Sequence, residues 1–339
     1  MKKAAVIGLG DVSHVHLAAI EKNPNIVLCA VCDKEESMRG KAPIGIPYYK
    51  DYKEMVEKEN PDCVHICLPH YLHYPVAKEL VKMGIHVFCE KPVALHTKEA
   101  EAFVKLEEEQ QEVQIGICLQ NRRNETVEML KSIIESKKYG DVVGTRGIVP
   151  WYRPVSYYTT KPWRGKWETA GGGCMINQSI HTLDLLYYLG GEVQGVRASV
   201  SQILGYDIEV EDTVTAQLFY KNGAKGLFFA TNANHKNESV QIVVQLERAE
   251  FRIYDNILYQ VMGDGSCNKL MEDNKMPGSK FYYGASHGKL IDEFYRSLET
   301  GNRTYVKVSD AKMSIALIDA IQMAGKTGID SSSLYGWRP

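Results

Sequence analysis

Short apolar runs alternate with helical patterns along the first part of the chain. The runs are Ala4–Ile7, Ile26–Cys32, Cys63–Leu68, His86–Cys89 and Val113–Cys118. They are rich in β-branched residues and almost free of polar positions, as strands buried on both faces of a parallel sheet must be. Strands that alternate with helices predict βαβ units and an α/β fold.

Helix signals lie between these runs. Asp51 and Glu54 have the spacing of a capping box, which predicts a helix from there to Lys58. A helical spacing over Pro75–Lys82 stops before Gly84, a plausible C-cap. Thr97 is expected to cap a helix that runs to about Gln110.

The pattern changes after about residue 124. A connecting helix is expected over Glu125–Lys137 and a strand over Val142–Val149. A loop dense in aromatic residues and prolines, Trp151–Trp167, leads through the triple glycine Gly171–Gly173 to a helical run over Met175–Leu189. Antiparallel strands are expected over 193–261, and two closing helices over Gly288–Thr300 and Asp310–Lys326. Val214, Ala216, Leu218 and Tyr220 alternate with polar residues, and Asn222-Gly223 predicts a type I′ hairpin turn.

The length of 339 residues fits two domains. The change of pattern predicts a dinucleotide-binding domain over 1–122 and a second domain over 123–339, whose last helix could pack back on the first. Hydrophobic residues make up 44% of the chain and the net charge is −2, so sizeable cores are expected and nucleic acid or an anionic membrane is not an expected partner.

No apolar stretch is long enough to span a bilayer, and Met1–Gly8 is interpreted as a first strand rather than a signal peptide. Most of the eight cysteines lie in apolar runs, which favours buried thiols in a reducing, cytoplasmic compartment. The ten histidines are scattered, and Cys63, His65 and Cys67 lack a second ligand pair, so no metal site is expected.

The chemistry begins at Gly8-Leu9-Gly10-Asp11-Val12-Ser13, which follows a strand and opens a helix. Gly8 permits the tight turn and Gly10 lets a pyrophosphate approach the helix N-terminus; Ser13 replaces the third glycine of the usual motif. Asp33 ends the next strand, where a carboxylate accepts from a ribose 2′-hydroxyl and repels a 2′-phosphate. NAD is therefore the expected cofactor, while the neighbouring Lys34 leaves NADP open.

Glu90-Lys91-Pro92 lies at the carboxyl end of a later strand, where open α/β sheets bind ligands. Burial and a nicotinamide cation would lower the pKa of Lys91 and suit it to proton transfer. The alternative is a surface lysine that Glu90 pairs.

His181 is the second candidate acid–base group. Asn177 stands one turn before it and Asp184 one turn after, so a continuous helix would place all three on one face. Asp184 either orients His181 or is an ordinary solvated residue, and His181 could itself be structural. The aromatic residues of 151–167 would form either a sugar-stacking wall or an interface.

In this order and spacing the chain resembles the glucose–fructose oxidoreductase, inositol dehydrogenase and MocA family over nearly its whole length. The matching segments are 8–13, 68–73, 90–92, 120–123, 163–164 and 171–181. The resemblance implies an N-terminal Rossmann domain and a C-terminal α/β domain with a large, mostly antiparallel open sheet. That sheet implies a homodimer or homotetramer.

The resemblance also implies an NAD(P)-dependent enzyme that transfers a hydride to or from a secondary alcohol carbon of a sugar, cyclitol or sugar derivative. The implied cofactor-binding residues are Gly8, Gly10, Asp11, Val12, Ser13, Asp33, Pro69, His70, His73, Glu90, Lys91, Asn121, Trp163, Arg164 and Tyr283. Substrate would meet Lys91, Tyr152, Asn177 and His181, with Lys91, His181 and Asn177 as the catalytic set. Relatives often have a cis Lys–Pro bond at the position of Lys91-Pro92.

Two positions depart from the family pattern. His70 stands where many relatives have asparagine, and Asn177 stands where the catalytic group often has aspartate. Asparagine cannot take a proton, so proton transfer is expected to fall on Lys91 and His181. Two other activities stay open: transient oxidation by tightly held NAD during glycoside cleavage or elimination, and sugar sensing without catalysis.

Overall fold

The computed structural model describes residues 1–274 and 286–327, and these divide into two compact units. The N-terminal unit contains Met1–Gln120 and Ser286–Lys312, and the C-terminal unit contains the described residues of 121–274 and 313–327. Each unit has its own sheet and its own core.

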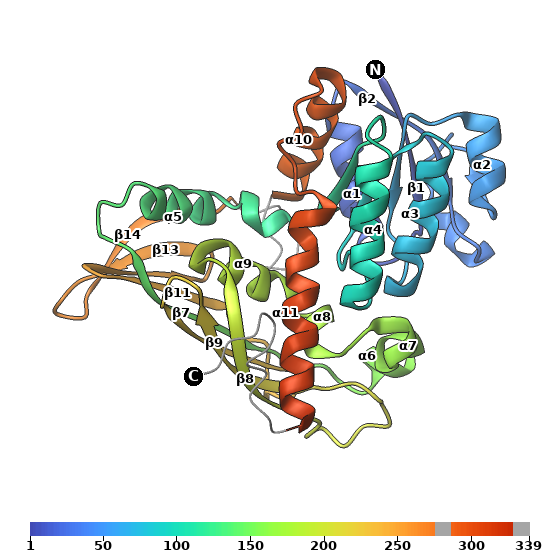
Figure 1. Ribbon diagram of the computed structural model, residues 1–339. Coiled ribbons are helices and arrows are strands. Elements are labelled where there is room, and N and C mark those ends of the chain that lie inside the picture. The colour runs from blue at the N-terminus through green and yellow to red at the C-terminus, as the bar shows by residue number, and fades with distance from the viewer. Residues whose placement is uncertain (275–285, 328–339) are drawn as a thin grey trace. The chain divides into compact units, whose positions relative to one another are not determined.

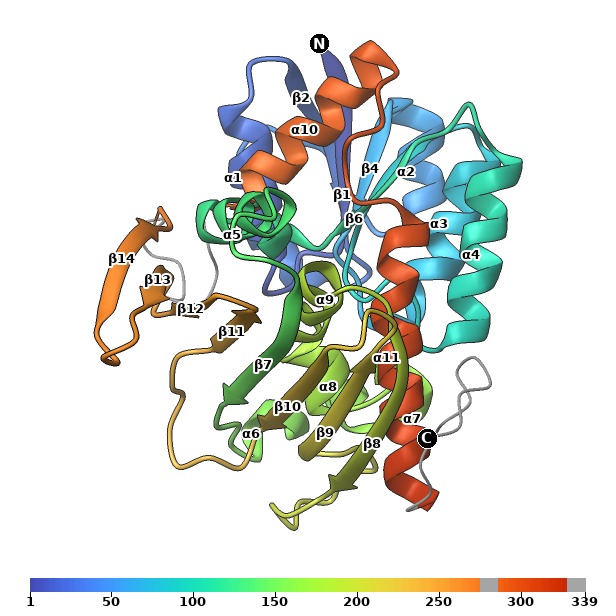
Figure 2. The same cartoon turned by 60° about the vertical axis from the view of Figure 1, so that its left-hand side comes forward.

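The N-terminal unit is built on a six-stranded parallel sheet in the order β3-β2-β1-β4-β5-β6, as expected for a Rossmann domain. Its strands are β1 (Lys2–Ile7), β2 (Ile26–Cys32), β3 (Tyr48–Tyr49), β4 (Cys63–Ile66), β5 (His86–Glu90) and β6 (Ile115–Cys118). Its helices are α1 (Ser13–Lys22), η1 (Glu36–Lys41), α2 (Tyr52–Glu59), η2 (His70–Leu72), α3 (His73–Lys82), α4 (Thr97–Glu109) and α10 (Ser286–Thr300). Helices α1 and α10 lie on one side of the sheet and α3 and α4 on the other (Figure 2).

Register brings the loops of this sheet together. Ile7 at the end of β1 pairs with Cys32 on β2 and with Ile66 on β4, and Ile66 pairs with Cys89 on β5. The residues that follow these four strand ends therefore meet at one edge of the sheet, where parallel sheets bind ligands.

The C-terminal unit is built on an eight-stranded sheet in the order β14-β13-β12-β11-β7-β10-β9-β8, which is antiparallel except between β7 and β10. Its strands are β7 (Val142–Pro150), β8 (Val193–Ser201), β9 (Thr213–Tyr220), β10 (Lys225–Thr231), β11 (Gln241–Leu246), β12 (Ala249–Tyr254), β13 (Ile257–Val261) and β14 (Cys267–Glu272). Figure 1 shows the sheet with helices α5 (Glu125–Glu135) and α9 (Ile180–Gly190) packed on it.

Four shorter segments, α6 (Ser156–Thr159), η4 (Pro162–Gly165), α7 (Trp167–Ala170) and α8 (Cys174–Asn177), join β7 to α9. Before β7, the 3₁₀ helix η3 (Gln120–Arg123) crosses from the first unit to the second, and α11 (Val308–Thr327) crosses later in the chain. No helix of residues 1–274 and 286–327 is long and apolar enough to cross a bilayer.

The predicted helix of Met175–Leu189 is wrong as a single element. The chain forms α8, then a break at Gln178 and Ser179, then α9. At this break the amide and the hydroxyl of Ser179 both donate to the carbonyl oxygen of Cys174, the first residue of α8, at 2.9 and 2.8 Å. This side-chain bond competes with the regular helical pattern. Asn177 and His181 therefore lie on different helices.

Two local predictions also need correction. The N-cap of α4 is His96, whose Nδ1 accepts from the Glu99 amide at 3.2 Å, and Thr97 is the first helical residue. The 221–224 hairpin turn is not type I′, because Asn222 does not have positive φ although Gly223 does, at 87°. Asp255 and Asn256 have φ of 52° and 59°, so the type I′ pattern occurs between β12 and β13 instead.

Candidate active site

The glycine turn after β1 has the geometry of a pyrophosphate cradle. Gly8 has φ of +90°, and a Cβ there would lie 2.6 Å from the carbonyl oxygen of Cys67. A Cβ on Gly10 would meet nothing within 4 Å, so the backbone at Gly10 is open to a ligand. The Ser13 hydroxyl donates to the Gly10 carbonyl oxygen at 2.9 Å and closes the turn where the usual motif has glycine. These residues fit a dinucleotide at the start of α1.

Asp33 is tied to this turn. Its Oδ2 accepts from the Leu9 amide at 2.8 Å, and its Oδ1 accepts from the Glu35 amide at 3.0 Å. A carboxylate has about four lone-pair positions, so two remain for a ribose hydroxyl. Asp33 thus both shapes the glycine turn and presents negative charge beside it.

His73 links the loops that follow β4 and β5. Its Nδ1 lies 2.7 Å from the Pro92 carbonyl oxygen and its Nε2 lies 2.7 Å from the Leu68 carbonyl oxygen. The ring is 1% exposed, so its contribution is to hold the Leu68-Pro69 segment against the segment after Lys91. The Lys91–Pro92 bond is cis.

Glu90, the last residue of β5, is buried at 5% exposure and does not form a simple surface pair with Lys91. Its Oε1 accepts from His16 Nε2 at 2.8 Å, and its Oε2 accepts from the Lys91 amide at 3.2 Å. Burial alone would raise the pKa of Glu90, but the hydrogen bond and charge of His16, with His287 and Lys91 nearby, hold it well below its ordinary value. An ionised carboxylate therefore lies directly before Lys91.

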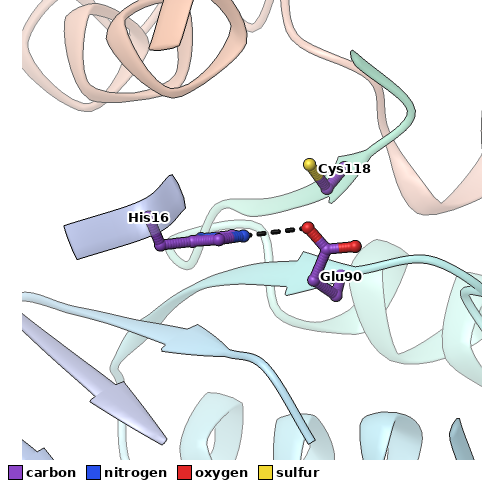
Figure 3. A group of neighbouring side chains, drawn as sticks. All are labelled: His16, Glu90 and Cys118. Carbon is purple, nitrogen blue, oxygen red and sulfur yellow. Dashed lines mark hydrogen bonds and ion pairs between the residues drawn. The ribbon is translucent and has the colours of Figure 1, made fainter. Parts of the chain in front are cut away.

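His16, Glu90 and Cys118 converge from α1, β5 and β6 (Figure 3), and their ligand atoms lie within 4.8 Å of one another. A hydrogen bond already joins His16 to Glu90 at 2.8 Å, whereas two ligands of a tetrahedral zinc would be roughly 3.3 Å apart. Burial raises the pKa of the Cys118 thiol well above its ordinary value, and the thiol donates to Gln120 Oε1. The geometry is that of a hydrogen-bonded network rather than of metal ligands.

The remaining candidates lie in the C-terminal unit. The triple glycine is held by Glu211, which sequence reasoning missed because it lies far along the chain. Its Oε2 accepts from the Gly173 amide at 2.9 Å and its Oε1 from the Met175 amide at 3.1 Å. A Cβ on Gly173 would lie 1.7 Å from the Glu211 carbonyl oxygen, so only glycine fits there. This anchor fixes the start of α8, which carries Asn177.

Asn177 belongs to a polar network with the aromatic loop. The Tyr157 hydroxyl donates to Asn177 Oδ1 at 3.3 Å and accepts from Gln178 Nε2 at 2.7 Å. Asn232 Nδ2 donates to Gln178 Oε1 and to the Tyr158 hydroxyl, both at 3.0 Å. Asn177 is therefore positioned by the loop rather than by a continuous helix with His181.

The aromatic loop divides by exposure. Trp151 and Tyr158 are 7% and 4% exposed and belong to the core of the unit, so they cannot form a sugar-stacking wall. Tyr152 is 38% exposed. The Arg164 guanidinium lies 4.1 Å from the ring centre of Tyr157 and 5.7 Å from that of Trp163, so these three side chains form one stack.

Asp184 neither orients His181 nor faces solvent. It is 1% exposed, and its two oxygens accept from Arg122 Nε at 2.8 Å and Arg122 Nη2 at 2.7 Å. The Ser314 hydroxyl of α11 donates to the same carboxylate at 2.9 Å. Both interpretations of Asp184 from sequence were wrong because its partners are distant in the chain. Asn121 lies next to Arg122, and its buried Oδ1 has no hydrogen-bond partner in the described part of the chain.

The site residues thus lie in two groups. The N-terminal unit contains Gly8, Gly10, Asp11, Val12, Ser13, Asp33, Pro69, His70, His73, Glu90 and Lys91. The C-terminal unit contains Asn121, Tyr152, Trp163, Arg164, Asn177 and His181. Tyr283 lies outside the described residues.

Comparison with known proteins decides the family. Residues 2–117 match the model of an oxidoreductase family with an NAD-binding Rossmann fold, GFO/IDH/MocA, and residues 127–252 match the C-terminal domain of the same family. The chain belongs to the GFO/IDH/MocA family. It is an NAD-dependent oxidoreductase, as the resemblance predicted.

Two of the relatives cover nearly the whole chain, and a third covers about half of it. Myo-inositol 2-dehydrogenase of Thermotoga maritima is 24% identical over 331 residues, 93% of each protein. The WlbA dehydrogenase of Bordetella pertussis, solved with NADH and UDP-GlcNAcA, is 27% identical with a TM-score of 0.84 over 97% of both chains. Levoglucosan dehydrogenase of Pseudarthrobacter phenanthrenivorans is 26% identical over 56% of this chain and 54% of its own.

Proposed function

We propose that this oxidoreductase transfers a hydride between NAD and a secondary alcohol or ketone carbon of a sugar, cyclitol or sugar derivative, and that Lys91 and His181 serve its proton transfer. The observation that carries the proposal is Lys91 itself. It directly follows a buried, ionised glutamate at the ligand-binding edge of the sheet that bears the glycine turn. The substrate class is supported by the inositol, levoglucosan and UDP-GlcNAcA named for the relatives.

NAD, when bound, supplies the hydride acceptor or donor. The chain supplies the binding and the proton path. In the oxidation direction Lys91 takes the hydroxyl proton, His181 positions the alcohol oxygen and the developing carbonyl, and Asn177 hydrogen-bonds a second hydroxyl. Asn177 donates and accepts but transfers no proton, so the proton goes to Lys91 while His181 assists by holding the alcohol oxygen that releases it.

The test is Lys91→Ala. We expect kcat to fall about 10²–10⁴-fold, the usual contribution of positioned proton transfer, while NADH affinity measured by fluorescence stays near that of the wild type. Lys98→Ala removes an exposed lysine of α4 and is the matched control. A Lys91→Ala enzyme with wild-type turnover would contradict the assignment.

A second experiment tests the substrate class. The enzyme is assayed with polyols, aldoses and sugar nucleotides, each with NAD and with NADP, and the formation of NADH or NADPH is followed by absorbance. Net reduction of the cofactor with a polyol or sugar supports the dehydrogenase. Cofactor that co-purifies with the protein, without net NADH formation, would support transient oxidation instead. Cofactor binding without any turnover would support a sensor.

The assembly and compartment belong to the same proposal. Gly147 faces Thr182 and Leu186 of α9, so the alternate residue Arg146 faces the other side of the sheet. That side has a shallow hollow of about 520 Å³ lined by β7 to β10, where Leu227 is 54% exposed. Such a face suits a homodimer or homotetramer through the sheet. All eight cysteines are free, which suits the reducing cytoplasm.

A further inference from the structure

A chain of buried side chains leads through the N-terminal unit to the carboxylate before Lys91. The Tyr295 hydroxyl of α10 lies 2.9 Å from His65 Nε2, His65 Nδ1 lies 2.9 Å from His16 Nδ1, and His16 Nε2 lies 2.8 Å from Glu90 Oε1. The exposed fractions of these four side chains are 2%, 0%, 0% and 5%. Figure 3 shows the last link, between His16 and Glu90.

The direction of that last link follows from the chemistry of its ends. An ionised carboxylate can only accept, so His16 Nε2 must carry the hydrogen that Glu90 receives. A single proton then lies between the two Nδ1 atoms, and in either position it leaves Nε2–H of His16 pointing at Glu90. His65 therefore orients His16 as the buried donor.

The groups that face Glu90 make His16 its main partner. They are His16 from α1, His65 from β4, His73 from α3, His287 from α10, Lys91, and the thiols Cys67, Cys89 and Cys118. Burial lowers the pKa of His65 and of His73, which favours their neutral forms. His287 Nε2 is 3.9 Å away, and burial lowers the pKa of His287 to about 4, so at neutral pH it carries no charge. Burial raises the pKa of all three thiols well above the ordinary value, so they are neutral as well. Glu90 also accepts from the Lys91 amide at 3.2 Å and from the Cys118 thiol, but the hydrogen bond of His16 lowers the pKa of Glu90 most.

We infer that His16 is a positioning residue of the reaction: held in place by His65, it keeps Glu90 ionised beside Lys91 and so sets the pH range in which Lys91 gives up its proton. The inference rests on the proposed role of Lys91. An anion beside an ammonium group favours the protonated form of the lysine. Without the His16 donor, burial would drive Glu90 to take up a proton, and Lys91 would then release its own proton at lower pH.

The experiment compares His16→Leu with His16→Gln. Both variants lose the ring nitrogen that faces His65, but only glutamine can place an amide N–H near Glu90. In the oxidation direction, where Lys91 must be neutral, we expect the acid limb of the kcat/KM profile to move down by about one pH unit in His16→Leu. It should stay at the wild-type position in His16→Gln. Glu90→Gln should move the limb the same way, and the double variant His16→Leu/Glu90→Gln should add nothing further.

A second measurement does not depend on activity. Infrared difference spectra should show a protonated buried carboxylic acid at neutral pH in His16→Leu, absent from the wild type and from His16→Gln, and lost again in the double variant. If His16→Leu does not fold, His16→Met fills the space without a donor and repeats both measurements.

The outcomes separate this inference from the proposed function. If Lys91→Ala loses turnover but the acid limb of His16→Leu stays in place and Glu90 remains ionised, His16 is only structural and the inference is wrong. If Lys91→Ala retains turnover, the proposed role of Lys91 fails, and the inference that depends on it fails too.

Discussion

At the scale of single residues, Glu211 shows how a buried carboxylate supports the candidate site without belonging to it. It accepts from the Gly173 and Met175 amides and so fixes the turn that precedes Asn177. Burial raises the pKa of Glu211 to about 7, more than the two amide hydrogen bonds lower it, and the neighbouring Asp212 adds to the rise. Glu211 is therefore expected to change its charge near neutral pH.

The sign of its effect on stability follows from linkage. A carboxyl with a raised pKa in the folded state binds its proton more tightly when folded, so its contribution is fully present below the ordinary value of 4.5. That contribution is lost as the pH rises to about 7. Between pH 5 and pH 8 the wild type should lose roughly 2–3 kcal/mol of unfolding free energy relative to Glu211→Gln, measured by urea denaturation at both pH values. The control Glu108→Gln, which changes an exposed glutamate of α4, should lose as much unfolding free energy between the two pH values as the wild type does. If Glu211→Gln also showed the same pH dependence as the wild type, the prediction would be contradicted.

At the scale of elements, the sequence pattern was most reliable where one physical constraint dominated. β2 begins and ends at the predicted residues because all seven of them are apolar, although Val27 is exposed and the continuous buried stretch begins only at Ala30. The two-residue β3 was missed because it is too short to show a period, and β14 because its residues are mostly exposed. The break between α8 and α9 was missed because both sides keep helical apolar spacing, whereas the Ser179 amide and hydroxyl both bond back to Cys174.

Element positions in the C-terminal unit depend on one buried ion pair. Arg122 of η3 and Asp184 of α9 are 7% and 1% exposed, and Ser314 joins α11 to the same carboxylate. Asp184→Asn would take the neutralising carboxylate away from the buried Arg122 charge. We expect a loss of about 3–5 kcal/mol of unfolding free energy in denaturant titrations.

The control for this pair is Glu135→Gln, which removes the exposed partner of Lys131 at 3.5 Å. Exposed pairs contribute little, so this variant should lose less than about 1 kcal/mol. Equal losses in the two variants would mean that the Arg122–Asp184 pair has no special role in holding η3, α9 and α11 together.

At the scale of the whole molecule, the proposed site residues are divided between the two units, with the glycine turn and Lys91 in the first and Asn177 and His181 in the second. The family and the cofactor could be inferred from sequence because their motifs are local: Gly8 to Ser13, Asp33 and Glu90-Lys91 each lie within or just after one strand. The supports of those motifs could not, since His16, His65, Tyr295, Glu211 and Arg122 gain their partners only through the fold. The roles assigned to the site residues stay predictions, and each unit offers a glycine with which to test its share.

Gly8→Ala and Gly173→Ala should separate cofactor binding from turnover. A Cβ on Gly8 would lie 2.6 Å from a backbone oxygen at a φ of +90°, so the pyrophosphate turn cannot keep its shape, and we expect NADH affinity to fall at least about tenfold. A Cβ on Gly173 would meet the Glu211 carbonyl oxygen at 1.7 Å, which displaces the turn that positions Asn177. That variant should keep NADH affinity within about threefold, by fluorescence titration, while kcat falls by about 10²-fold, because misplaced positioning groups act on the chemical step. Gly10→Ala, where the added Cβ meets no protein atom within 4 Å, should fold normally and still bind NADH more weakly, which distinguishes a ligand clash from a damaged turn. If Gly173→Ala instead lost NADH affinity as completely as Gly8→Ala, the turn at Gly173 would serve cofactor binding and not only the position of Asn177.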